Sequence, residues 1–237
     1  MWTTKGLARG LLTTPYPRSR PADPGAMPPL PRVTPVTEAG TAVTEVCPTG
    51  ALTLDGGGVA VDLGRCIACQ RCRLDAATMA WTSKQHVVRQ VSASGLPGKA
   101  FRHSLHVRVV DAGDGGETLR ELRQLTSPYY AIHRLGIFFT PTPRDADVLL
   151  VVGPVTQGMR QALLDTYQAM PQPKWVMAVG SGAISGVPFG PSFTSAAGAG
   201  DVLPLDVVVP GNPPPPLAIL DGLLTLLGRL PAREPLP

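Results

Sequence analysis

Three cysteines of this chain lie close together in the run Cys66-Ile-Ala-Cys69-Gln-Arg-Cys72, and the fourth, Cys47, stands directly before a proline. This spacing wraps the backbone tightly enough to bring three sulfur atoms to one small site. Four cysteines in 237 residues are too few for a disulfide scaffold, and their close spacing favours metal binding over disulfide bonds. The sequence therefore predicts a compact metal-binding module around these residues.

The order of the cysteines indicates an iron–sulfur cluster rather than a zinc ion. A structural zinc site usually takes two C-x2-C pairs from separate knuckles. The bacterial ferredoxin run is C-x2-C-x2-C-x3-C-P, and its fourth cysteine ligates the other cluster of a two-cluster protein. Aligned with two such runs, this chain has lost every ligand of one cluster, at positions Thr37, Gly40, Val43 and Ala76. We therefore predict one [4Fe–4S] cluster, with zinc or inert thiols as the alternatives, bound by the remaining set of Cys47, Cys66, Cys69 and Cys72.

The segments around the cysteines divide the first hundred residues into an arm, a module and a linker. Residues 1–14 predict either a short amphipathic segment on a membrane or partner, or a frayed tail. Residues 15–35 carry eight prolines, which fix φ and remove backbone donors, so the arm at 1–35 should be extended and not packed. The iron–sulfur module at 36–80 contains a predicted hairpin, and residues 81–104 are interpreted as a linker.

Short apolar strands alternate with helices in the rest of the chain. Strands are predicted at residues 105–110, 137–140, 148–152, 175–179 and 207–209. Helices are predicted at residues 118–125, 158–170 and 216–227. This alternation favours a parallel sheet. The predicted fold class is an α+β ferredoxin-like Fe–S module followed by an α/β parallel-sheet, flavodoxin-like domain at 105–229, with a tail at 230–237.

The charge content of the chain indicates partner proteins rather than nucleic acid. Charged residues make up 16% of the sequence, below the usual quarter, which suggests that partner subunits cover much of the surface. The net charge of +4 is too small to indicate nucleic-acid binding, and basic and aromatic residues are not interleaved. No apolar run approaches the roughly 20 residues that span a bilayer.

Other candidate sites carry weaker signals. The glycine-rich residues 111–117 lie between a strand and a helix, where a turn can hold a phosphate, but their acidic side chains oppose an anion and favour an ordinary loop. Ser181 lies between two glycines without the G-x-S-x-G pattern or an evident triad, so no catalytic residue is predicted. The histidines show no metal-ligand spacing; they are His86, His103, His106 and His133.

Several motifs connect both parts of the chain to one family of complexes. Residues 1–90 resemble the two-cluster ferredoxin subunit of respiratory complex I and of the group 4 [NiFe]-hydrogenases, through the cysteine pattern and Thr14-Pro-Tyr-Pro17. Residues 105–229 resemble the small, 20 kDa-type subunit (the NADH:ubiquinone oxidoreductase B-like subunit) of the same complexes. The motifs that carry this second likeness include Asp111-Ala-Gly113, Pro128-Tyr-Tyr130, His133-Arg-Leu-Gly-Ile137, Gly153-Pro-Val-Thr156, Ala178-Val-Gly180 and Pro210-Gly211. The chain looks like a fusion of two neighbouring subunits.

The second resemblance implies a cluster site that this chain has lost. In that family the small subunit holds its own [4Fe–4S] cluster through four cysteines. The corresponding positions hold no iron ligand here; they are Gly115, Thr118, Gly182 and Asn212. Glycine has no side-chain donor, and neutral Thr and Asn are poor ligands for iron. We therefore expect this degenerate site to be empty.

Together these features predict a non-catalytic electron-transfer subunit of a complex I-like or group 4 hydrogenase-like oxidoreductase. The resemblance implies a hydrogenase or complex I-type large subunit and membrane subunits as partners, with residues 141–144 near the large subunit. It also implies a peripheral position on the cytoplasmic side of the cell membrane, reached through partners or the N-terminal arm. The alternatives are a non-redox scaffold subunit of a hydrogenase-derived complex and, less favoured, a free ferredoxin-type carrier.

Overall fold

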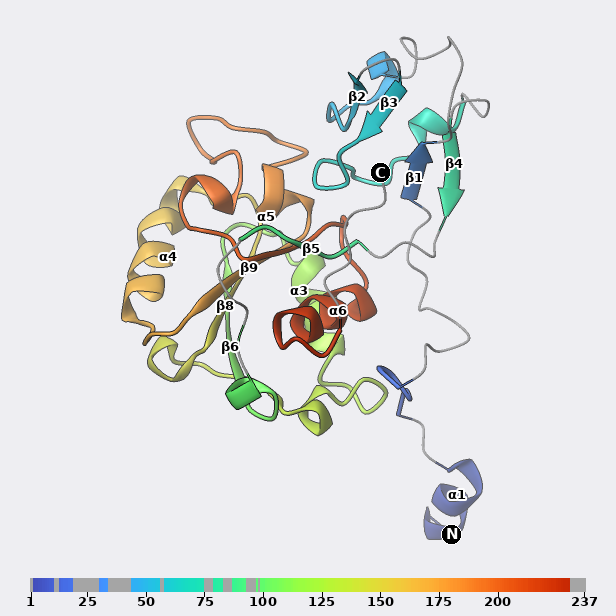
Figure 1. Ribbon diagram of the computed structural model, residues 1–237, viewed down its shortest axis with the longest axis vertical. Helices are drawn as coiled ribbons and strands as arrows, with labels where there is room; N and C mark the ends of the chain where they lie inside the picture. Colours follow the sequence, from blue (N-terminus) through green and yellow to red (C-terminus); the bar gives the residue numbers. More distant parts are fainter. Residues whose placement is uncertain are drawn as a thin grey trace.

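The computed structural model describes residues 2–10, 13–18, 30–33, 44–55, 58–74, 79–82, 87–92, 97 and 99–230. A large sheet domain forms the body of the molecule, and a smaller module that contains the cysteines lies beside it (Figure 1). Some residues of the sequence-based predictions fall outside the described residues; they are Thr37, Gly40, Val43, Ala76, His86 and the tail from residue 231.

The sheet of the C-terminal domain has six strands in the order β5-β10-β9-β8-β6-β7. All neighbouring pairs are parallel except β5 with β10. The strand bounds are β5 Arg89–Gln90, β6 Leu105–Asp111, β7 Ile137–Phe139, β8 Val148–Val152, β9 Trp175–Val179 and β10 Val207–Val209. This arrangement confirms the predicted parallel α/β sheet, and three central strands have the predicted bounds.

Helices cover both faces of this sheet. On one face α3 (Glu117–Gln124) and α6 (Pro216–Leu226) share a hydrophobic core with the strands. On the other face α4 (Gln157–Ala169) and the short α5 (Ser181–Ser185) do the same (Figure 1). All five residues of β8 and of β9 are buried, because central strands of a sheet covered on both faces meet no water. Four short 3-10 helices complete the domain at η2 Lys99–Phe101, η3 Ile132–Leu135, η4 Pro143–Asp145 and η5 Ala199–Asp201.

The cysteine module consists of two small antiparallel pairs of strands. β1 (Leu30–Val33) pairs with β4 (Met79–Thr82), and β2 (Leu52–Asp55) pairs with β3 (Gly58–Val61). Residues 44–46 make a short helical turn, and η1 (Arg71–Leu74) follows the cysteine loop. The β2–β3 pair confirms the predicted hairpin.

Three strands lie where the sequence predicted none: β1, its partner β4 and β5. β1 belongs to the proline-rich segment, yet Leu30 is only 2% exposed and the strand pairs with β4, so the expectation of an unpacked arm is wrong there. β5 lies in the predicted linker and joins the edge of the large sheet. In both cases the partner strand comes from a distant part of the chain, and such pairing leaves no local pattern.

Residues 13–18 anchor the start of the chain to the C-terminal domain. The Thr14 N–H donates to the Tyr129 carbonyl at 2.8 Å, and the Arg134 guanidinium donates to the Thr14 carbonyl at 2.7 Å. The buried Tyr16 donates its hydroxyl hydrogen to the Asp221 carboxylate on α6. The arm is therefore packed at this point as well.

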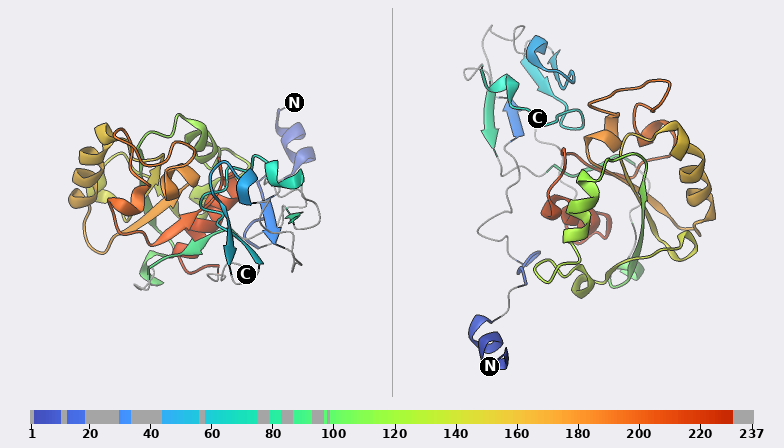
Figure 2. Two further views of the ribbon diagram at one scale, coloured as in Figure 1. Left: turned by 90° about the horizontal axis from the view of Figure 1, so that it is seen from above. Right: turned by 180° about the vertical axis from the view of Figure 1, so that it is seen from behind.

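Helix α1 (Trp2–Arg9) precedes this anchor and stands away from the sheet domain, as Figure 1 and both views of Figure 2 show. Residues 4–10 are all exposed, with Leu7 at 84%. No helix among the described residues is both long and apolar enough to cross a membrane. A short helix thus lies where the sequence predicted either an amphipathic segment or a frayed tail, and its contact with a membrane or partner stays a prediction.

Candidate metal centre

The four cysteines line one pocket in the small module. Cys47 follows the helical turn at 44–46, Cys66 and Cys69 lie in the loop after β3, and Cys72 lies in η1. Apolar side chains complete the lining; they include Pro31, Leu52, Ile67 and Trp81. The structure therefore brings the four predicted ligands around a single hollow.

The backbone of the cysteine loop adopts an unusual conformation to achieve this. Ala68 and Gln70, which flank Cys69, have φ angles of 53° and 63°, in the left-handed region that non-glycine residues rarely enter. Such conformations cost energy and persist where the surrounding structure requires them, as at ligand-holding loops. The left-handed conformations of Ala68 and Gln70 change the direction of the backbone before and after Cys69, so that the loop curves around the pocket.

Backbone and hydroxyl groups donate hydrogen bonds to two of the sulfur atoms. The Ala51 N–H donates to Cys47 Sγ at 3.2 Å, and the Ala68 N–H donates to Cys66 Sγ at 3.4 Å. Thr49 Oγ1 lies 3.6 Å from Cys47 Sγ. Burial raises the pKa of Cys47, but the hydrogen bonds from Thr49, Ala51 and Leu52 outweigh it and leave the pKa below its usual value. Sequence reasoning missed these donors, because only the fold decides which amides point at a sulfur.

The remaining sulfur atoms influence one another. Burial raises the pKa of Cys66, and the charges of Cys47 and Cys69 raise it further. Burial and the charge of Cys66 raise the pKa of Cys72 to about 11. The physical cause is that several thiolates in one pocket repel one another unless a positive centre lies among them. The donor set is thus suited to a cationic metal group.

A single metal ion and a cluster require different arrangements of their ligands. Within the part of the chain that the structure describes, no three His, Cys, Asp or Glu side chains are gathered closely enough to hold one metal ion. Ligands of one zinc ion all lie about 2.3 Å from the same atom. Each cysteine of a [4Fe–4S] cluster binds a different iron atom, so its ligands surround a wider space. Four thiols around one pocket are the donor set that such a cluster would need.

The four degenerate positions lie at the carboxyl edge of the large sheet. Gly115 and Thr118 follow β6, Gly182 lies in α5 after β9, and Asn212 follows β10. A Cβ atom on Gly180 would lie 3.2 Å from Thr118 Oγ1 and 3.7 Å from the Gly211 carbonyl oxygen, so the segments after these strands are close together. The fold thus brings together the segments in which the family's small subunit carries its cluster cysteines. In this chain none of the four corresponding positions has a thiol.

The acidic residues of the loop after β6 bind their own backbone. The Asp111 carboxylate accepts hydrogen bonds from the Gly113 and Asp114 N–H groups at 2.9 and 2.8 Å. Asp114 accepts one from the Leu119 N–H at 3.1 Å. These amides are the groups that would bind a phosphate, so their occupation by carboxylates supports the interpretation as an ordinary loop.

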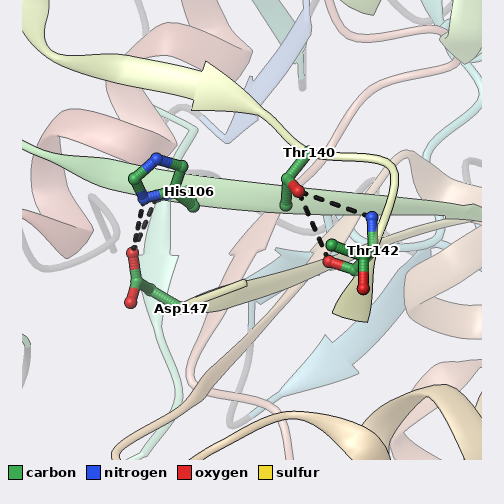
Figure 3. Close-up of polar contacts among 4 residues, drawn as sticks. All are labelled: His106, Thr140, Thr142 and Asp147. Atoms are coloured by element: carbon green, nitrogen blue, oxygen red, sulfur yellow. Dashed lines mark hydrogen bonds and ion pairs between the residues drawn. The ribbon is translucent and has the colours of Figure 1, made fainter. Parts of the chain in front are cut away.

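The described histidines lie elsewhere. His106, at the start of β6, donates its backbone N–H to Asp147 Oδ2 at 2.8 Å, and its ring Nδ1 lies 3.6 Å from the same oxygen (Figure 3). Its ring stacks on Phe138, as does that of His133. Figure 3 also shows Thr140 and Thr142, whose hydrogen bonds shape the turn into η4. These contacts join the amino ends of the strands, and they give the histidines a structural role.

Residues 116–226 match the protein family described as NADH ubiquinone oxidoreductase, 20 Kd subunit. The B subunit of the NADH-quinone oxidoreductase of Heliobacterium modesticaldum is 45% identical over 92 residues, which are 39% of this chain and 53% of that protein. Its counterpart of the same name from Clostridium beijerinckii is 47% identical over 98 residues, 41% of this chain and 58% of that protein. The chain thus spans little more than half the length of these relatives.

A solved structure is also similar: a chain of the membrane-bound sulfane sulfur reductase, an archaeal respiratory membrane complex. It is 31% identical, with a TM-score of 0.49, over 54% of this chain and 71% of that chain. The family match covers α3 to α6 and most of the strands of the large sheet. Residues 116–226 are therefore similar to the 20 kDa-type subunit. The resemblance of the cysteine module to a ferredoxin subunit lies outside the matched residues and stays a prediction.

Proposed function

We propose that this protein is an electron-transfer subunit of a complex I-like or hydrogenase-like oxidoreductase, and that it carries one [4Fe–4S] cluster. The observation that carries the proposal is the pocket that all four cysteines line. Similarity of the C-terminal domain to the B subunits of NADH-quinone oxidoreductases supports the type of complex.

The order of elements in the small module supports a ferredoxin-like fold. Strand β1, the turn at 44–46, β2, β3, η1 and β4 follow one another in the β-α-β-β-α-β order of that fold. Two antiparallel pairs hold the loops between them, and the cysteines lie on these loops and on η1.

In this proposal Cys47, Cys66, Cys69 and Cys72 hold the cluster, which would accept and release one electron at a time. The Ala51 and Ala68 amides donate to two of the sulfurs and stabilise negative charge on them, which favours the reduced state. The protein itself thus supplies the position of the site and the hydrogen bonds to its sulfur atoms.

The C-terminal domain would serve as a scaffold, because Gly115, Thr118, Gly182 and Asn212 supply no thiolate for a second cluster. Its partners would be a hydrogenase or complex I-type large subunit and membrane subunits, with the chain held peripherally on the cytoplasmic side. The absence of a thiol at these positions also favours the second candidate, a non-redox scaffold subunit in which the cluster only stabilises the fold.

Iron and sulfide analysis with EPR on anaerobically purified protein tests the proposal. We expect about four iron atoms and one reducible spin system per chain. The Cys72→Ser variant should lose the signal, whereas Ser192→Ala, which changes a loop outside the cysteine module, should retain it. Eight iron atoms would contradict the empty second site, and none would contradict the cluster. A cluster that exchanges no electrons within the purified complex would favour the scaffold.

A further inference from the structure

Two serine side chains of α5 hold the cysteine loop against the C-terminal domain. Ser181 Oγ donates to the Cys66 carbonyl at 2.9 Å, and Ser185 Oγ donates to the Gly64 carbonyl at 2.8 Å. The serines are four residues apart and therefore lie on one face of the helix, one turn from each other. Both acceptors are backbone groups of the loop that contains Cys66, more than a hundred residues away in the chain.

The contact is buried and closely fitted. Ser181 is fully buried, and Cys66 is 8% exposed. A Cβ atom on Gly64 would lie 2.9 Å from Ile184 Cγ2, which is closer than real Cβ atoms approach. A larger residue at position 64 would require the loop or the Ile184 side chain to shift. The serine hydroxyl groups on α5 and the glycine at position 64 in the cysteine loop thus fit one another across the contact.

The contact lies at the edge of the sheet that contains the degenerate positions. Helix α5 includes Gly182, and the Ser181 N–H donates to the carbonyl of Gly211, the neighbour of Asn212, at 2.8 Å. Figure 1 shows the cysteine loop beside α5, above the end of the sheet. The same residue therefore binds the cysteine loop with its side chain and the segment after β10 with its backbone.

We propose that Ser181 and Ser185 are positioning residues that dock the cysteine loop on the carboxyl edge of the sheet and thereby orient Cys66. The role of Cys66 as a ligand rests on the function proposed above; the docking itself does not. Groups that hydrogen-bond to a ligand residue fix its direction, and their loss weakens metal binding. In this chain the docking surface and the degenerate site coincide.

Hydrogen exchange on the full chain, as purified, tests the docking directly. A buried carbonyl that loses its donor destabilises the contact, so the amides of residues 63–68 should exchange about fivefold faster in Ser181→Ala and in Ser185→Ala. The matched control is Ser192→Ala, because Ser192 bonds only within its own loop, to Thr194 and Ser195. Wild-type exchange rates in both serine variants would overturn the proposal, provided that the amides of β8 stay protected.

A second pair of variants tests the fit without changing either serine. Gly64→Ala places a methyl group against Ile184 Cγ2 and should also speed exchange at residues 63–68. Adding Ile184→Ala removes Cγ2 and should restore the slow rate, whereas adding Ile184→Val keeps that methyl group and should not. Equal rates in the two double variants would contradict the proposed contact.

The metal-loaded protein supplies a separate readout for Cys66. Ser181→Ala should release iron to a chelator about fivefold faster than wild type, and Ser192→Ala should not. If the wild-type protein binds no iron, the function proposed above fails while the exchange experiment still decides the docking. If iron is bound and its release is equal in all variants, the orienting role of Ser181 is wrong.

Discussion

Tyr16→Phe is a sharp test of how the start of the chain is anchored. The Tyr16 ring is 4% exposed, and its hydroxyl donates to the Asp221 carboxylate, which is 8% exposed. The substitution keeps the ring and removes only the hydrogen bond. Loss of one partner of a buried hydrogen bond costs about 1–3 kcal/mol, so the free energy that holds the arm closed should fall by about 2 kcal/mol. The open form of residues 13–18 should then be roughly thirtyfold more populated.

Hydrogen exchange at the Thr14 amide measures this opening, because that amide is bonded to the Tyr129 carbonyl. Its exchange should be about thirtyfold faster in Tyr16→Phe, with unchanged protection in β8. Tyr129→Phe is the control: its ring is 41% exposed, and the substitution leaves the backbone acceptor in place. An unchanged rate in Tyr16→Phe, or an equal increase in both variants, would refute the reasoning.

Three further outcomes are expected. Gly136→Ala should lower the free energy of unfolding by roughly 3 kcal/mol or more in urea titrations, because φ is +77° and the new Cβ would lie 2.2 Å from the His103 carbonyl oxygen. Gly158→Ala, which has open space around it in α4, should raise the free energy of unfolding by about 0.5 kcal/mol. Similar effects of the two substitutions would contradict this reasoning. Burial raises the pKa of Glu121, so the folded protein favours the protonated carboxyl group and loses stability as the pH rises through that pKa. Glu121→Gln should remove this loss of stability. Parallel stability–pH curves for the wild type and the variant would refute the explanation. Chelation of iron should speed amide exchange at residues 47–72 and leave β8 protected, and no change would argue against a bound cluster.

The sequence was most informative where residues are buried on both sides. The bounds of β8, β9 and β10 were predicted correctly, because runs of apolar residues such as 148–152 have few structures open to them other than a central strand. The close spacing of Cys66, Cys69 and Cys72 placed them together by local turns, whereas Cys47 reaches the same pocket from before the β2–β3 hairpin; that they bind a cluster stays a prediction.

What the sequence could not supply are contacts between distant segments. β5 consists of Arg89 and Gln90, which carry no strand pattern and become a strand only beside β10. The hydrogen bonds of Ser181 and Ser185 could not be predicted, because their acceptors are backbone carbonyls and every residue has one. The backbone amide that donates to Cys47 Sγ could not be predicted either, because every residue except proline has an amide N–H. Side-chain patterns predict elements, whereas backbone partners are chosen by the fold.

The anchor at residues 13–18 and strand β5 have a joint consequence for the cysteine module. Both are fixed on the C-terminal domain, one before the module in the chain and one after it. The module is therefore tethered at both ends, and its contact with α5 is an intramolecular event governed by an effective concentration. Short tethers give values near the millimolar range, so a contact too weak to join two separate proteins suffices here. Dilution therefore does not separate the cysteine module from the C-terminal domain. Two separate chains would need a larger contact area to stay together on dilution.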